Sequence, residues 1–151
     1  MANTQAMCTS FKTELLNGLH ALGTTVTRGA TTADNLKAAL YLATATVNAA
    51  TTAYSATNEV SGSGYTAGGI AVTNATGPSS TGTTAFWTPS ASLVYSSVTL
   101  ATAFDCVLIY NSSQSNKAIS VHTFGSQTIT AGNFTLTMPT NDASNALIRL
   151  A

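Results

Sequence analysis

The amino-acid sequence predicts a mainly β protein: an antiparallel two-sheet sandwich or jelly roll with one N-terminal amphipathic helix. Two observations lead to this fold class. Short segments rich in Thr, Val, Ile and aromatic residues recur from residue 36 onward, with turn-forming residues between them. Only one window, near the N-terminus, has helical spacing. Because 151 residues fit one domain, we expect an N-terminal arm over residues 1–9 and a single β-sandwich domain over 10–151.

The predicted helix spans Ser10–Leu22. Its apolar residues recur at intervals of three and four, as on one helical face: Phe11, Leu15, Leu16, Leu19 and Leu22. Thr9 or Ser10 is available as an N-cap, and Gly23 as a stop signal. His20 falls on the polar side, where we expect it to be solvated or to cap the helix. The arm before the helix has two interpretations: a frayed tail, or a segment that becomes ordered on a neighbouring subunit.

The remaining elements are predicted strands. The first, "NLKAALYLATATVN", is rich in helix-prone Ala, but alternating side chains and the Thr and Val that follow favour a strand. "GPSSTG" is predicted as a turn and "NSSQSN" as a loop. The other strands, in order, are "GGIAVTNA", "TTAFWTP", "SLVYSSVTL" (one bent strand or two), "FDCVLIYN" (the most hydrophobic and expected to be central), "KAISVHTF", "SQTITAGNFTLTMP" (two strands around Ala131–Asn133) and "NALIRLA".

Composition and charge exclude several classes of protein. Charged residues make up 7% of the chain and balance to zero, against roughly 25% in ordinary soluble proteins. A hydrophobic content of 44% argues against disorder, and no apolar run is long enough to span a membrane. Five Lys and Arg spread along the chain form no basic patch for nucleic acid. Near-zero net charge favours association with other subunits.

The sequence predicts no enzyme, no catalytic residue, no cofactor and no metal site. Cys8 and Cys106 are expected to be buried free thiols. A nucleophilic site built from Cys106, His122 and Asp105 can be imagined, but adjacent residues of a strand point to opposite faces, which separates Asp105 from Cys106. Zinc, EF-hand and Walker patterns are absent from the sequence.

The stretch "TTAYSATNEVSGSGYTAGG", Thr51–Gly69, is rich in glycine and resembles a phosphate-binding loop only superficially. It contains no lysine, and a β-type segment rather than a helix follows it. We therefore expect a structured connection with glycines in tight turns, anchored by Tyr54 and Tyr65. Glu59 is expected to cap local amides, or to meet a cation such as Arg28 on this subunit or a neighbour.

Five residues are candidates for contact with a partner. Trp87, the only tryptophan, serves either as a core anchor or as an interface residue. The others come from the arm and from the glycine-rich connection, and the full set is Asn3, Gln5, Met7, Glu59 and Trp87.

The blocks "TTAYSATNEVSGSGYTAGG" and "VLIYN…FGSQTITAGNFTLTMP", preceded by "FKTELLNGLHAL", resemble small virion proteins of tailed bacteriophages. The resemblance covers nearly the whole chain, and no secretory signal is evident in "MANTQAMCTSFK". It implies a capsid decoration or cement protein, made in the bacterial host cytoplasm and placed on the virion exterior. Such a protein forms a β-sandwich or jelly roll, is often trimeric, and bridges capsomers of the major capsid protein. A tail, neck or fibre-associated β-domain and a carbohydrate-binding jelly roll are the alternatives.

Overall fold

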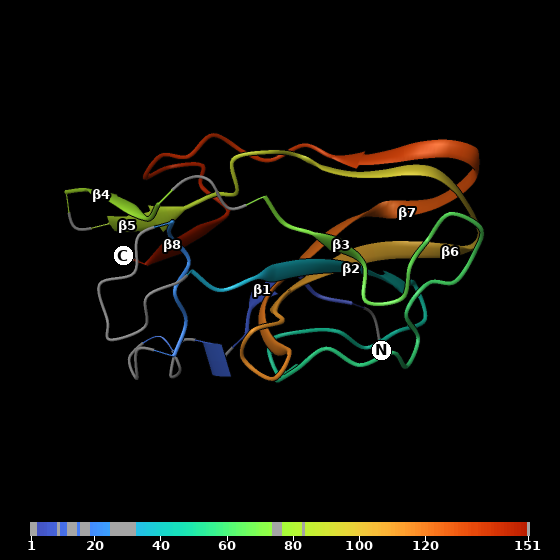
Figure 1. Ribbon diagram of the computed structural model, residues 1–151, viewed down its shortest axis with the longest axis horizontal. Helices are drawn as coiled ribbons and strands as arrows, with labels where there is room; N and C mark the ends of the chain where they lie inside the picture. The colour runs from blue at the N-terminus through green and yellow to red at the C-terminus, as the bar shows by residue number, and fades with distance from the viewer. Residues whose placement is uncertain are drawn as a thin grey trace.

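The computed structural model describes residues 3–8, 10–11, 15, 19–24, 33–73, 77–82 and 84–150. Its described elements are strands arranged in two antiparallel sheets, so the mainly β prediction is confirmed (Figure 1). A five-stranded sheet has the order β1-β7-β6-β2-β3, and a three-stranded sheet has the order β4-β5-β8. The bounds are β1 Ala6–Met7, β2 Leu36–Leu42, β3 Ile70–Ala71, β4 Ser79–Thr81, β5 Thr84–Trp87, β6 Leu93–Asn111, β7 Lys117–Leu136 and β8 Ile148–Leu150.

β6 and β7 form one long hairpin in place of the several short strands predicted for this region. They contain 19 and 20 residues and stay paired from Leu93↔Leu136 to Asn111↔Lys117. Figure 1 shows the pair bending at one end of the molecule and returning along its rim. Where the sequence predicted breaks between short strands, β6 and β7 continue with local irregularities. Ser97 and Ala131 have positive φ, and the pairing register between the two strands shifts near both. β-Bulges absorb extra residues and bend a strand without ending it.

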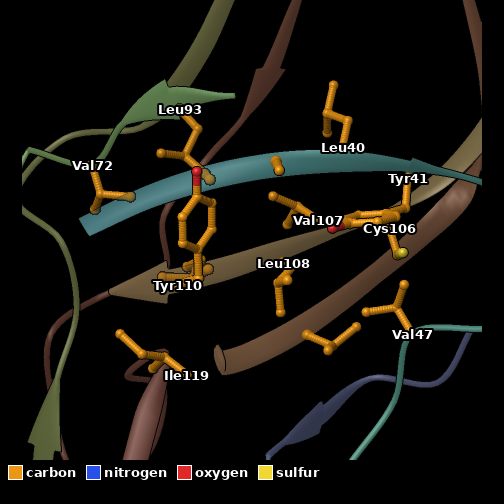
Figure 2. Packing of buried hydrophobic residues seen from close by; sticks show 14 of the residues in the cluster. Leu40, Tyr41, Val47, Val72, Leu93, Cys106, Val107, Leu108, Tyr110 and Ile119 are labelled. Carbon is orange, nitrogen blue, oxygen red and sulfur yellow. The ribbon is translucent and has the colours of Figure 1, made fainter. Parts of the chain in front are cut away.

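β2 confirms the prediction of a strand in the Ala-rich segment. Ala38, Ala39 and Leu40 are fully buried, so both faces of this strand are covered. β2 pairs with β6 from Leu36↔Asn111 to Leu42↔Phe104. Burial on both faces outweighs the helical preference of Ala. Figure 2 shows side chains of β2 and β6 in the core, with the sulfur of Cys106 directed toward Val47.

The three-stranded sheet corrects one prediction and supports another. The predicted turn "GPSSTG" contains β4, which pairs with β5 through Ser80↔Ala85, and only Gly82 within it has positive φ. Exposed Ser and Thr can form an edge strand because one partner strand satisfies half of their backbone groups. "NALIRLA" does form a strand, β8, which pairs with β5 through Trp87↔Ile148.

The N-terminal predictions change most. The described residues 3–8 of the arm lie against their own chain, where β1 pairs with β7 through Ala6↔Val121 and Met7↔Ser120. The predicted helix 10–22 is not seen among the described elements. Residues 12–14 and 16–18 lie outside the described part, Ser10, Phe11 and Leu15 have helical backbone, and 19–22 do not. The apolar spacing instead buries Phe11 and Leu22 individually against the core.

Candidate functional site

The connection Thr51–Gly69 is a structured segment that lies along the outer edge of β2. The amide of Leu42 donates to the carbonyl of Asn58, and the amide of Val60 donates to that of Leu40, both at 3.0 Å. β3 pairs with the same edge of β2 nearer its start, so β3 and the connection together cover this edge. The predicted structured connection is found, and its backbone has positive φ at Gly64, Gly68 and Gly69, as expected for glycines in tight turns.

Glu59 accepts three hydrogen bonds from within this connection. One carboxylate oxygen, Oε2, accepts from the hydroxyl of Tyr54 at 2.7 Å. The other, Oε1, accepts from the hydroxyl of Tyr65 at 2.7 Å and from the amide of Gly68 at 2.8 Å. The residue is 9% exposed. Of the two predicted roles, capping a local amide is therefore the one found, whereas Arg28 lies outside the described residues. The carboxylate is buried and bonded within its own connection, and its contact with a partner stays a prediction.

All five tyrosines of the chain belong to the same network. Tyr54 stacks on Tyr110 with ring centroids 4.8 Å apart, and Tyr65 stacks on Tyr95 at 6.0 Å. The remaining hydroxyls donate to backbone carbonyls, Tyr41 to Ser55, Tyr95 to Ala38 and Tyr110 to Gly68. Glu59 thus joins the two tyrosine stacks. Burial raises the pKa of each phenol, to about 12 for Tyr54, where the hydrogen bond to Glu59 adds to the effect.

Asn3 and Trp87 have roles within the chain. The side-chain amide of Asn3 donates to the carbonyl of Leu42 and to Asp105, and its oxygen accepts from the amide of Val47. Asn3 thereby fastens the arm to the body of its own subunit. Trp87 is 1% exposed and belongs to the core. The core-anchor interpretation of Trp87 is the one the structure supports, whereas Asn3 is half-buried and its contact with a partner stays a prediction.

Gln5 and Met7 line a hollow of about 570 Å³ beside β1. The hollow contains one charged side chain, Arg149, whose guanidinium donates to the carbonyl of Ser144. Burial lowers the pKa of His122 in its wall to about 4, so this imidazole is neutral at neutral pH. The walls are otherwise neutral, and a space of this size suits a small ligand or a peptide side chain. Its described lining is Gln5, Met7, Thr84, His122, Pro139, Ala143, Ala146, Leu147 and Arg149.

A buried polar cluster was not predicted from the sequence. His20 is 7% exposed and not solvated, which corrects its predicted place on a polar helix face. Its Nδ1 lies 3.0 Å from the side-chain amide of Asn111, which also donates to Asp34 at 2.8 Å. Asp34 further accepts from the amide of Ala21 at 2.9 Å. Residues so distant in sequence meet because Asn111 pairs with Leu36, two residues after Asp34, and no local pattern reveals this.

The geometry of β6 and β7 does not assemble a nucleophilic site. Val107, and not Cys106, pairs with His122, so the thiol and the imidazole lie on opposite faces. Cys106 is fully buried, and its pKa is raised to about 12, chiefly by burial and further by Asp105. Cys8 is also buried and forms no disulfide, as predicted. His122 Nε2 instead lies 2.8 Å from the hydroxyl of Ser120.

The described residues form neither a metal-binding cluster nor a membrane-spanning helix. Within the described residues, no group of three or more His, Cys, Asp or Glu is placed to hold a metal ion. The same residues contain no helix with the length and apolar character needed to cross a membrane. All eleven Phe, Tyr and Trp side chains are described, and each is buried or half-buried. There is therefore no exposed aromatic platform of the kind that sugar-binding grooves use.

Comparison with known proteins provides no relative. No protein-family model matches the chain, and neither a curated protein nor a solved structure matches it. The function must be argued from the residues and their arrangement.

Proposed function

We propose that this chain is a non-enzymatic structural protein of a tailed-bacteriophage virion, a decoration or cement protein on the capsid exterior. It would contact the major capsid protein, act as a symmetric homo-oligomer, and bridge capsomers. We further propose that its two antiparallel sheets belong to the sandwich or jelly-roll class. The resemblance of Thr51–Gly69 and of the "FGSQTITAGNFTLTMP" block to small virion proteins supports this role.

The observation that carries the proposal is the neutral surface of the long hairpin. None of the exposed residues of β6 and β7 is charged: Val94, Ser96, Ser97, Ala101, Thr102, Gly125, Ser126, Gln127, Thr128, Thr130, Ala131, Asn133 and Thr135. Hydroxyl and amide groups form hydrogen bonds across an interface without the large desolvation cost of burying charges. A protein that is packed against other subunits benefits from such a surface. A free monomer with the same surface would lack the solubility that charged residues provide.

Stabilisation of a shell follows from mass action. A protein that binds only the assembled lattice stabilises it by about RT ln(1 + [L]/Kd) at each site. Several contacts per oligomer add avidity when their spacing matches the lattice. The rigid attachment of the connection Thr51–Gly69 through Glu59 and the tyrosines favours this, because a preordered subunit loses less entropy on binding.

Quantitative mass spectrometry of purified virions tests the proposal. We expect hundreds of copies per particle, and sedimentation of the purified chain with expanded empty capsids. A handful of copies would place it in the tail or neck instead. Its absence from virions would refute any virion role. A glycan array, on which we expect no binding, separates the proposal from a carbohydrate-binding module.

A further inference from the structure

The outer edge of β7 is uncovered over Phe124–Leu136. β1 pairs with β7 only around Ser120 and Val121, and the amide of Cys8 donates to Ile119. Beyond that point, no strand of the described part of the chain pairs with the outer side of β7. Figure 1 shows this half of β7 on the rim of the molecule, with β6 on its inner side. A row of backbone amides and carbonyls therefore faces outward along this rim.

The two-stranded ribbon formed by β6 and β7 packs against little else where it bends. Residues 125–128 of β7 are exposed in succession, as are Ala101 and Thr102 of β6. Consecutive exposed residues in both strands show that the ribbon has little cover there, although Phe104, which pairs with Gln127, is buried. An isolated two-stranded ribbon is marginally stable in water. This part of the hairpin gains most from a further strand.

The edge also lacks the protection usual for a strand that remains single. Sheet edges are commonly guarded by Lys or Pro, or by inward-pointing charges. Phe124–Leu136, "FGSQTITAGNFTL", contains no charged residue and no Pro. Its irregularities are at Ala131, which has a φ of 46°, and between Thr123 and Gln127, where the register with β6 shifts. On the neighbouring β6, Val94 is 45% exposed and lies opposite Thr135, so an apolar side chain adjoins the uncovered edge.

From these observations we infer that the Phe124–Leu136 edge of β7 pairs with the same edge of a second copy of this chain, as antiparallel strands around a two-fold axis. A two-fold contact uses one patch on both partners, so it needs nothing beyond this chain. Two identical edges repel if they carry charge, and this one carries none. The pairing continues the five-stranded sheet across the contact and satisfies the outward backbone groups of both copies. It is a property of the isolated chain and does not depend on the virion role.

Edge charges test the pairing. Gln127 and Thr130 are exposed, so Q127K/T130K leaves the core unchanged while placing like charges against each other in the pair. We expect sedimentation velocity to show a dimer for the wild type and a dissociation constant raised about tenfold or more for the variant. The matched control is T57K/S61K, which adds the same charge at exposed positions of the connection and should leave the dimer intact. Circular dichroism must show the same fold for all three proteins.

Opposite charges provide the second arm. A mixture of Q127K/T130K with Q127E/T130E should form a heterodimer, because opposite charges then face each other across the edge. Amide hydrogen exchange in the wild type should show protection within Phe124–Leu136 that rises with protein concentration. The inference is overturned by a wild-type monomer at all concentrations, by a dimer that tolerates Q127K/T130K, or by a trimer with unprotected β7 amides. That last result would leave the proposed function standing, whereas absence from virions would refute the function and leave the pairing intact.

Discussion

Replacing Glu59 with Ala should destabilise the fold substantially. The carboxylate accepts from Tyr54, Tyr65 and the amide of Gly68, and Ala provides no acceptor for any of them. The connection would then lose the group that holds both tyrosine stacks together. Thr57→Ala, in the same connection but exposed and without a side-chain role of this kind, is the control.

The magnitude follows from the three donors. A buried donor left unsatisfied costs about 1–3 kcal/mol. The amide of Gly68 is buried and is expected to incur most of that cost, whereas the half-buried hydroxyls of Tyr54 and Tyr65 can partly recover hydrogen bonds to water. The sum is about 3 kcal/mol, a large part of the 5–15 kcal/mol typical of a domain. With a urea dependence of about 2 kcal/mol per molar, the unfolding midpoint should fall by about 1.5 M.

Equilibrium urea unfolding measures this effect, and the buried Trp87 provides the fluorescence signal. Glu59→Gln should fall between wild type and Glu59→Ala, because its amide oxygen can keep one or two of the bonds. Thr57→Ala should stay within about 0.5 kcal/mol of wild type. A loss below about 1 kcal/mol for Glu59→Ala would refute the reasoning, since it would mean that the three donors find other partners at no cost.

Three further changes have expected outcomes. Gly69→Ala should lower the thermal unfolding midpoint strongly, because φ is 72° and a Cβ would lie 1.7 Å from a carbonyl oxygen of β2. The control Gly77→Ala, which has open space around it, should leave the midpoint unchanged. Equal midpoints for the two variants would contradict this prediction. Burial lowers the pKa of His122 to about 4, below the ordinary 6.5, so on acidification the unfolded chain takes up a proton at His122 before the folded chain does. The free energy of unfolding should therefore fall as pH drops from 6.5 to 4, by at most about 3 kcal/mol. His122→Gln should remove that part of the pH dependence in urea titrations, and an unchanged profile would exclude His122 as its source. Asn3→Ala should lower the free energy of unfolding, measured by calorimetry, by about 1–2 kcal/mol, because three hydrogen bonds are lost. Gln5→Ala, which truncates an exposed side chain, should lower it little. Equal losses would show that Asn3 does not fasten the arm.

Local patterns were sufficient where one segment's own chemistry decides its structure. Alternation and β-branched residues identified Leu36–Leu42, Thr84–Trp87 and Ile148–Leu150 as strands. The glycines of Thr51–Gly69, with no lysine and no following helix, correctly indicated a connection with tight turns. Tyr54 and Tyr65, which were predicted to anchor it, contact the sheet: Tyr54 stacks on Tyr110, and Tyr65 accepts from the amide of Leu40.

Local patterns failed where distant residues compete for the same position. The spacing around Phe11 is helical, yet Leu19–Leu22 are not in a helix, because His20 and Ala21 bond to Asn111 and Asp34 instead. Ala131–Asn133 has the composition of a turn, but continuous pairing with β6 keeps it within β7 as a bulge.

By itself, the sequence determined a mainly β chain with almost no charge, a hydrogen-bonding surface of Thr, Ser and Asn, and buried free thiols, because these depend on composition and short-range periodicity. Only the tertiary structure decided that Glu59 lies inside a tyrosine network, that Asn3 fastens the arm to its own subunit, and that β7 has an uncovered edge. Each of these depends on which strands lie side by side. The side chain of Asn3 alone bonds to residues 39 and 102 positions away, and no window of sequence contains that information.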